Sequence, residues 1–513
     1  MTSRGTRVAL VATACGLVAC GLYGKTLDAQ FVWDDHTLIV RNETLTHLAD
    51  LWRCFTTAVT AGENVSYYRP ILMVSYLVDR QIWGLDPMGF HLTNVLLHGI
   101  DTALVCGLAF AYSGSLVAAS IGALLFACHP IQAQAVALIL GRNDLLLVPP
   151  VVGMLLVARY RRAVAPCLLL YATALWTKET GIIAPLLLVI SEGLSPRRVT
   201  QARMRWGSLT FGFLAIAAVY LGVRRLILGS LIGLAPPLPS DASRGMLVPV
   251  IFGYYARHVL LPWSLSPTPY SPALADGAPL VAAIGITLAF AAAVGWILHK
   301  STKMAAGLLF FAIALLPVLG FVPMQVTILE HRTYLPMVGI ALFITAAAAE
   351  RERLATIIAI PLLAGLAFAT SARLPIFHDD RSLWATAVER APGSAYAHQG
   401  YGIALTHDGL HDAAVAEFRE VLHIDPEFDR ARYELALALE RGGRRDAAIA
   451  TIEEQLRLHP KDVAAWNALA YFWKQSEDPA KSEAALRQGL LIEPQNPVLL
   501  RNLRELLGER STP

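Results

Sequence analysis

Long apolar runs constrain this chain more than any other feature. Leu, Val, Ala and Ile fill most of residues 1–372, whereas residues 376–513 have the composition of a water-soluble helical protein. Of the 513 residues, 55% are hydrophobic and only 16% are charged, and the mean hydropathy of +0.50 is far above that of soluble domains. We therefore expect one part of the chain to lie in lipid and another part in water.

About eleven of the runs are candidates for membrane-spanning helices, because a span needs about 20 apolar residues. They lie near residues 7–27, 90–111, 115–138, 144–158, 163–177, 180–193, 207–228, 279–298, 304–322, 334–349 and 354–372. The first run could instead be a signal peptide, but it has no clear small-residue cleavage site and continues into an aromatic segment. We expect it to stay as an uncleaved span.

Basic residues in the short loops predict the orientation in the membrane. They occur at Arg4 and Arg7 and in the segments 159–162, 195–205, 299–303 and 350–353. If the count is right, all of them lie on one side, which is then cytoplasmic. Residues 28–89 and everything after residue 372 would lie on the outer side.

One outer segment is ambiguous. Residues 251–267 are apolar but contain Arg257 and His258, so we expect a helix lying at the interface. The alternative is a twelfth span, which would move two of the basic loops outside and so conflicts with the charge rule.

Charge and cysteine content exclude two further classes. The net charge of +3 is too small to indicate nucleic acid binding, and the basic residues form no continuous stripe. Five of the six cysteines lie in apolar segments, so no disulfide framework is readable.

Four prolines divide the water-soluble part into equal units. Pro392, Pro426, Pro460 and Pro494 are each 34 residues apart, which is the length of a tetratricopeptide repeat. The expected boundaries are a membrane-embedded domain at 1–372, a linker with a degenerate repeat helix at 373–392, three repeats at 393–426, 427–460 and 461–494, and a capping helix and tail at 495–513.

The repeats also show the expected alternation of small and large residues. Counted back from each proline, the small positions are Gly402, Ala436 and Ala470 and the large ones are Phe418, Ile452 and Leu486. Stacked repeats form a concave face that commonly binds a peptide. The aromatic segment 466–473 could be a binding box, but Trp466 and Trp473 have the spacing of packing positions.

Polar clusters recur at the predicted outer ends of the spans, beginning with "WDD" at 33–35. Taken singly, each has a structural explanation: a solvated turn at Asp34 and Asp35, a hydrogen bond between His98 and Asp101, a kink at His129–Pro130, and an ion pair between Lys178 and Glu179. Together they predict a charged chamber at the outer membrane face, because ionisable groups at membrane depth are costly and often functional.

The order of these motifs resembles one family. "FVWDDHTLIVRN", "YYRPILMVSYLVD", "GFHLTNVLLH", "HPIQAQAVALILGRNDLL", "KE" and "EHRTYLP", followed by repeats, look like the transmembrane and tetratricopeptide-repeat-containing O-mannosyltransferases and their bacterial relatives, of the GT-C class. The resemblance covers nearly the whole chain, although the known eukaryotic members carry more repeats. It implies an all-α polytopic bundle followed by a repeat solenoid outside the cytoplasm, and the short tail and basic loops suggest a bacterial inner membrane.

The resemblance also implies an activity: inverting transfer of a sugar, mannose in the family, from a polyprenyl or dolichyl phosphate to a hydroxyl of an acceptor protein held by the repeats. Such transfer needs a base for the acceptor proton and cations for the leaving phosphate. No metal or other cofactor is expected. The implied catalytic residues are Asp34, as base, and Asp35. The expected phosphate ligands are Arg69, Arg142, Lys178 and Arg332, and the supporting polar residues are His91, His129, Asp144, Glu179, Glu330 and His331.

The competing interpretation is a membrane scaffold or transporter whose repeats bind a partner. A transporter should show matching halves and discontinuous helices near the midplane, and the sequence shows no matching halves. Polar groups clustered at the outer leaflet would favour the transferase, whereas groups spread through the midplane would favour transport.

Overall fold

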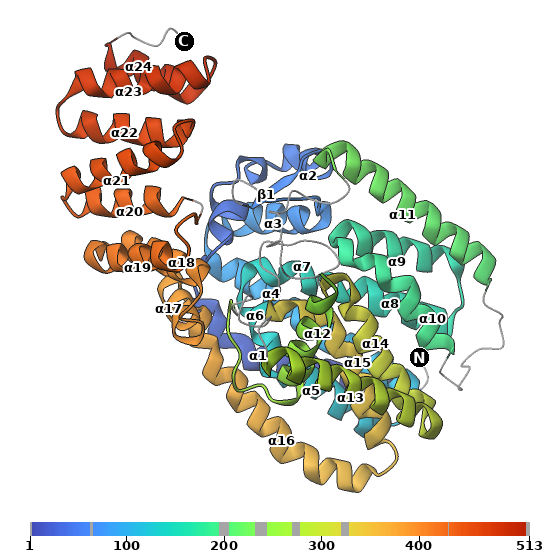
Figure 1. Ribbon diagram of the computed structural model, residues 1–513. Coiled ribbons are helices and arrows are strands. Elements are labelled where there is room, and N and C mark those ends of the chain that lie inside the picture. Colours follow the sequence, from blue (N-terminus) through green and yellow to red (C-terminus); the bar gives the residue numbers. More distant parts are fainter. Residues whose placement is uncertain are drawn as a thin grey trace. The chain divides into compact units, whose positions relative to one another are not determined.

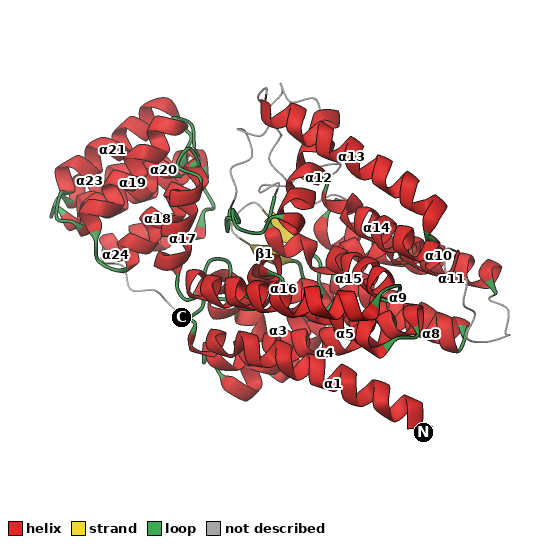
Figure 2. Cartoon of the chain, turned by 90° about the horizontal axis from the view of Figure 1, so that it is seen from below, coloured by secondary structure: helices red, strands yellow, loops and turns green. Residues whose placement is uncertain are grey.

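The chain divides into two compact units, Met1–Ser382 and Leu383–Pro513. The computed structural model describes residues 3–61, 65–193, 205–230, 244–268, 278–319, 328–428 and 430–508. Over these residues both units are helical, apart from one antiparallel pair of strands in the first, β1 (Val59–Ala61) and β2 (Val65–Tyr67) (Figures 1 and 2). The all-α class is confirmed, with this small hairpin as an addition that the sequence did not predict.

The first unit contains long helices and short helical turns. Its helices are α1 (Ser3–Tyr23), α2 (Arg53–Thr56), α3 (Pro70–Trp83), α4 (Pro87–Ser113), α5 (Leu116–Cys128), α6 (Ala133–Ala137), α7 (Arg142–Leu145), α8 (Val148–Tyr160), α9 (Val164–Thr177), α10 (Ala184–Gly193), α11 (Trp206–Leu228), α12 (Arg244–Leu260), α13 (Ala278–Lys300), α14 (Thr302–Leu315), α15 (Tyr334–Ala348) and α16 (Glu352–Arg373). The turns used below are η2 (His36–Val40), η5 (Pro130–Gln132), η7 (Glu179–Ile183), η10 (Glu330–Thr333) and η11 (Leu374–Phe377).

Over the described residues, each of the expected apolar runs coincides with a helix, but many of these helices are shorter than a full span. The last residues of the run 304–322 lie outside the described residues. Among the described residues, six helices are long and apolar enough to cross a membrane, or seven if the bent pair at 116–137 counts as one span. This is fewer than the eleven expected. The shorter helices include α5 and α15, which are extensively buried. Backbone breaks at membrane depth are tolerated where the chain is enclosed by protein. The first unit nevertheless has the apolar helices of an integral membrane protein.

Small residues let the central helices approach closely. α4 packs against α1, α5, α8 and α15, and α14 packs against α15 (Figure 1). A Cβ on Gly307 would lie 2.7 Å from the carbonyl oxygen of Gly339, and a Cβ on Gly339 would lie 2.6 Å from that of Gly307. Helices in lipid gain their association from such close packing, since apolar burial alone gives no preference for protein over lipid.

The first part of the ambiguous segment 251–267 is helical, and residues 261–267 follow the helix without regular structure. α12 contains Pro249 and ends at Leu260, and its side chains Ile251 and Tyr255 pack in a buried cluster with Phe311 and Leu315 of α14. Its expected position at the interface stays a prediction, because the helix contacts alone do not locate it in a membrane.

The second unit is a stack of helix pairs (Figure 1). Its helices are α18 (Ala395–His407), α19 (His411–Ile424), α20 (Ala431–Arg441), α21 (Arg445–Leu458), α22 (Val463–Gln475), α23 (Pro479–Ile492) and α24 (Pro497–Leu506), and α17 (Asp380–Arg390) precedes them. Each of the four spaced prolines follows the end of a helix by two residues, as expected for a residue that cannot continue one.

The predicted small and large positions meet in this second unit. A Cβ on Gly402 would lie 2.8 Å from the Phe418 ring, and the corresponding residues of the next two repeats are buried in one continuous core. Trp466 and Trp473 pack against that core. Their packing role is therefore confirmed, and the binding-box alternative is not needed to explain them.

Candidate active site

The turn that follows α1 contains one fully buried carboxylate. Asp35 is fully buried, and its Oδ2 accepts a hydrogen bond from the Val32 N–H at 3.1 Å. Burial raises the pKa of Asp35 to about 8, and the neighbouring charge of Asp34 contributes in the same direction. Asp35 is therefore largely protonated at neutral pH and serves to close the turn.

The preceding carboxylate has different surroundings. Asp34 is half-buried, and among the described residues no hydrogen bond or ion pair engages its carboxylate. Its backbone carbonyl accepts from the N–H groups of Thr37 and Leu38 at 3.0 and 2.8 Å, which starts η2. Burial raises the pKa of Asp34 to about 6. An unengaged carboxylate with a pKa just below neutrality suits a general base.

A guanidinium lies at the start of α3. Arg69 donates two hydrogen bonds to Glu179, from Nε to Oε2 at 3.0 Å and from Nη2 to Oε1 at 2.6 Å. Arg224 of α11 lies 3.9 Å from the same carboxylate. Although burial would raise the pKa of Glu179, these cations hold it well below its usual value, so the carboxylate stays ionised.

Lys178 pairs with a different partner from the one expected. Its Nζ lies 2.6 Å from Oδ1 of Asp144 in α7, and Nε2 of His331 in η10 lies 4.0 Å from the other oxygen of that carboxylate. The structural alternative, an ion pair between Lys178 and Glu179, is therefore contradicted, because each residue pairs with a different partner. Adjacent residues in an extended backbone point in opposite directions, and Lys178 has φ −155° and ψ 137°.

Tyr67 interacts electrostatically with both the predicted base and the predicted phosphate ligands. Its ring faces the Arg69 guanidinium at 4.2 Å. Burial raises the pKa of the Tyr67 phenol, the charges of Arg69 and Arg332 lower it, and those of Glu179 and Asp34 raise it. One phenol therefore lies within electrostatic range of the predicted base and of two predicted phosphate ligands.

Arg142, in contrast, is enclosed within the helix bundle. It is fully buried, and it is paired with Asp79 at 2.6 Å. Its Nε donates to Asn94 at 2.8 Å and its Nη2 donates to the Phe90 carbonyl at 2.7 Å. These contacts consume most of its donors, so the structure favours a structural role over the expected phosphate contact.

The remaining supporting residues also have backbone or internal partners. His91 contacts the Gln30 carbonyl at 3.3 Å, and His129 contacts the Val259 carbonyl at 3.0 Å. The helix pair around His129 is bent by 49°, as the kink interpretation predicts. Glu330 accepts two hydrogen bonds from Arg373, at 3.1 and 2.9 Å.

One polar group lies deeper in the bundle. The Tyr334 hydroxyl is placed between His98 Nδ1 at 2.7 Å and Asp101 Oδ2 at 2.9 Å, and all three side chains are buried. The structural alternative of a direct His98–Asp101 hydrogen bond is thus replaced by a bridge through Tyr334. His98 and Asp101 lie in the middle of α4 rather than at a helix end.

Several residues of the site were missed by sequence reasoning. Tyr67, Arg224 and Arg373 contact or influence predicted site residues, and the charge of Asp380 acts on Asp35. Tyr67 was within the quoted "YYRP" motif, and Asp380 belongs to a second acidic pair, "DD" at 379–380. These two sequence features could have indicated Tyr67 and Asp380, whereas no feature of the sequence indicated Arg224.

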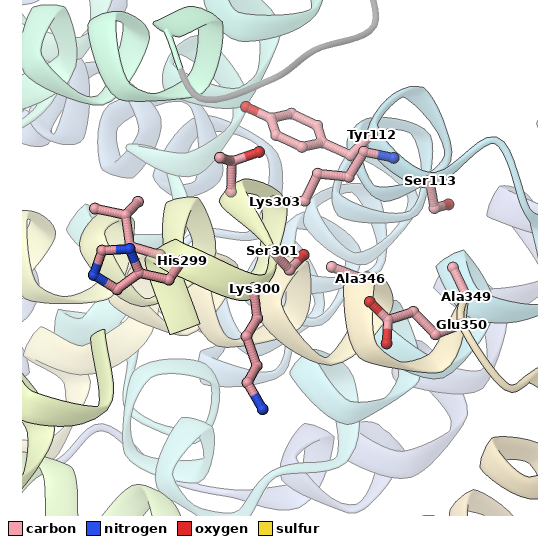
Figure 3. A pocket seen from close by; sticks show the side chains of 11 residues that line it. Tyr112, Ser113, His299, Lys300, Ser301, Lys303, Ala346, Ala349 and Glu350 are labelled. Carbon is pink, nitrogen blue, oxygen red and sulfur yellow. The ribbon is translucent and has the colours of Figure 1, made fainter. Parts of the chain in front are cut away.

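No metal site is apparent among the described residues, where no group of three His, Cys, Asp or Glu side chains could hold an ion. A cavity of about 450 Å³ lies elsewhere, lined by Tyr112, Ser113, Lys300, Lys303 and Glu350 among others (Figure 3). It adjoins the Ser113 end of α4, whereas Phe90 and His91 are at the other end. The cavity contains none of the predicted site residues.

Comparisons with known proteins agree with the family that the sequence resembles. Two family models, both described as tetratricopeptide repeat, match residues 381–427 and 405–471. Protein O-mannosyl-transferase Tmtc1 of Drosophila melanogaster is 36% identical over 200 residues, which is 36% of this chain and 22% of that protein. Protein O-mannosyl-transferase TMTC4 of Homo sapiens is 26% identical over 486 residues, covering 78% of this chain and 64% of that protein. These matches confirm the resemblance to the transmembrane and tetratricopeptide-repeat-containing O-mannosyltransferases.

The chain spans less than two thirds of the length of these curated relatives. Among solved structures, ArnT from Cupriavidus metallidurans, bound to undecaprenyl phosphate, aligns with a TM-score of 0.42 and 14% identity, covering 88% of this chain and 80% of that one.

Proposed function

We propose that this chain is an inverting glycosyltransferase that moves a sugar from a polyprenyl-phosphate donor to a hydroxyl of an acceptor protein, with mannose as the first candidate sugar. The observation that carries the proposal is Asp34: a half-buried carboxylate that no described side chain engages, with its pKa raised to about 6. The names of the relatives support the reaction class.

In the proposed step, Asp34 removes the proton of the acceptor hydroxyl as its oxygen attacks the anomeric carbon. The bond from that carbon to the phosphate oxygen breaks, and the lipid phosphate leaves with the electron pair. Phosphate needs no proton to leave, but the negative charge that develops on it needs cations close by. Arg69, Arg332 and Lys178 are the candidates, and no metal ion is required by this chemistry.

Two of the candidate cations already have carboxylate partners in the structure. Arg69 and Lys178 are balanced by Glu179 and Asp144, so a phosphate would compete with or extend these pairs. An arginine fork can bind a carboxylate and a phosphate through different N–H groups. The carboxylates would then hold the cations in place before the donor arrives.

The placement of the polar groups favours the transferase over the transporter. Asp34 follows α1, Arg69 precedes α3, Asp144 precedes α8, Lys178 follows α9 and Arg332 precedes α15. Charged groups at helix ends are what a lipid-phosphate substrate at the membrane surface requires. His98 and Asp101, the α4 members of the buried group around Tyr334, lie about 16–21 Å along that helix from its start, at 1.5 Å per residue. Both are hydrogen-bonded to the Tyr334 hydroxyl.

The proposal places Asp34 and the repeats on the outer side of a bacterial inner membrane, with the N-terminus in the cytoplasm. The basic loops support this orientation. Reporter fusions within residues 28–89 and after residue 376 would locate both segments, and a cytoplasmic signal from either would contradict the arrangement.

The decisive experiment uses the purified full chain in lipid nanodiscs with a panel of polyprenyl-phosphate sugars and a mixture of acceptor peptides. We expect release of lipid phosphate with one donor and sugar attachment to a peptide hydroxyl. If no donor in the panel is turned over by protein that is correctly folded, the scaffold or transporter interpretation takes its place.

A further inference from the structure

Asp380 contacts the turn that carries Asp34 at two points. Its Oδ1 accepts a hydrogen bond from the Trp33 N–H at 2.7 Å, and its Oδ2 lies 2.8 Å from Nε2 of His36. Trp33 and His36 flank the acidic pair on either side. Asp380 is more than 340 residues away in the sequence but belongs to the same compact unit.

A second contact runs beside this one. The Gln30 N–H donates to the His378 carbonyl at 2.8 Å. The segment after the first span therefore lies along the segment after α16, where η11 leads into Asp380. The two carboxylate contacts extend this pairing to the residues next to Asp34.

The turn has a backbone conformation that needs such support. Trp33 has φ of +58°, which is unfavourable for a residue with a bulky side chain. Residues held in this region persist when the surrounding structure fixes them, and they are concentrated at functional sites. The hydrogen bond from the Trp33 N–H to Asp380 acts on the strained residue itself.

The neighbouring carboxylate shows that Asp380 has a separate task. Asp379 accepts from the Ser382 N–H at 2.8 Å and contacts His378 at 2.9 Å, so it is Asp379 that caps the start of α17. Asp380 is not needed for that cap, and both of its oxygens face the turn.

We propose that Asp380 is a positioning residue, which holds the Trp33–His36 turn so that the carboxylate of Asp34 points at the acceptor hydroxyl. This role rests on the proposed function of Asp34. Asp380 itself does not touch the reacting atoms. Misplacement of a catalytic group by about 1 Å can lower the rate by about 10²-fold, which is the effect expected when the contact is lost.

Three variants of the full chain test the proposal: D380A, D380N and the matched control D379A. D380A removes both contacts. D380N keeps an oxygen for the Trp33 N–H and offers an N–H to a neutral His36, so it should restore the geometry. D379A removes an adjacent carboxylate of the same size that does not touch the turn.

Two measurements separate positioning from general stability. We expect D380A to lower kcat by about 10²-fold with little change in KM for the donor, since the phosphate ligands are unaffected. D380N should recover most of the rate, and D379A should retain it. Hydrogen exchange should become faster within residues 31–42 in D380A and remain unchanged there in D379A.

The exchange measurement does not depend on activity. If the wild-type chain turns over no donor, the proposed function fails, while unchanged exchange in D380A would separately show that Asp380 does not hold the turn. If the wild type is active, D34N is inactive and D380A keeps the full kcat, the positioning role is wrong although the proposed function stands. Should D380A fail to fold, H36A, which removes one of the two contacts, must lower kcat without raising KM, and a wild-type kcat in H36A would overturn the proposal.

Discussion

Arg142 and Asp79 form an ion pair within the helix bundle, with Nη1 and Oδ2 2.6 Å apart and neither side chain more than 6% exposed. The pair links α7 to α3, and the Arg142 bonds to Asn94 and Phe90 add α4. A charge buried in this way depends on its partner, because either group alone would lose its compensation in a medium of low dielectric constant.

The variant R142M should therefore destabilise the fold. We expect the free energy of unfolding to fall by about 3–5 kcal/mol, because Asp79 would be left buried without its cation. Thermal unfolding in detergent measures this, with R161M, at an exposed arginine, as the control. A stable R142M protein that has lost only donor binding would restore the phosphate-ligand role.

D34N should lower turnover by about 10²–10⁴-fold, which is the usual contribution of a general base. Expression and membrane insertion should not change, since the Asp34 carboxylate holds no other described group in place. Release of lipid phosphate from a verified donor is the measurement.

D35N should have a smaller effect on that rate. Asp35 is largely protonated already, and an amide oxygen can replace its Oδ2 as acceptor for the Val32 N–H. Wild-type rates in both D34N and D35N would show that the "WDD" turn is structural only.

The rate should depend on pH in a defined direction. The base must be ionised to accept a proton, and the raised pKa of Asp34, about 6, places the loss of activity there rather than near pH 4. We expect kcat/KM to rise with pH through a midpoint near 6, where half of the base is ionised, and to level off above it. A profile with its acidic limb near 4 would indicate an exposed carboxylate or a different base.

R332A should weaken donor binding as well as turnover. A cation that contacts the phosphate stabilises both the bound donor and the transition state, so its loss raises the donor Kd and lowers kcat/KM. Donor titration by isothermal calorimetry and initial rates would measure the two effects. An unchanged Kd would remove Arg332 from the phosphate site.

Deletion of residues 393–513 tests the role of the repeats. Transfer to protein acceptors should fall, whereas transfer to small hydroxyl compounds should persist, because Asp34, the candidate cations and Asp380 all belong to the first unit. Comparison of the two acceptor types with the same donor gives the result. Unchanged protein glycosylation would leave the repeats with a scaffolding role.

The sequence by itself determined the features that depend on local pattern. Hydrophobic runs located the membrane helices, because each run must be buried in lipid or protein, and the 34-residue proline spacing located the repeats, because each proline ends a helix. The motif order also indicated the family before any contact was known. Helix lengths were less predictable, since α5 and α15 are short yet enclosed by neighbours.

Only the tertiary structure decided which charged groups meet. Lys178 and Glu179 are adjacent in sequence, yet Lys178 pairs with Asp144 and Glu179 pairs with Arg69. Asp34 and Asp35 look equivalent in the sequence, but burial and one hydrogen bond separate them into a candidate base and a turn-closing acid. These outcomes depend on distances of a few ångströms between segments far apart in the chain. Electrostatic energies and desolvation vary steeply over such distances, and no local pattern encodes them.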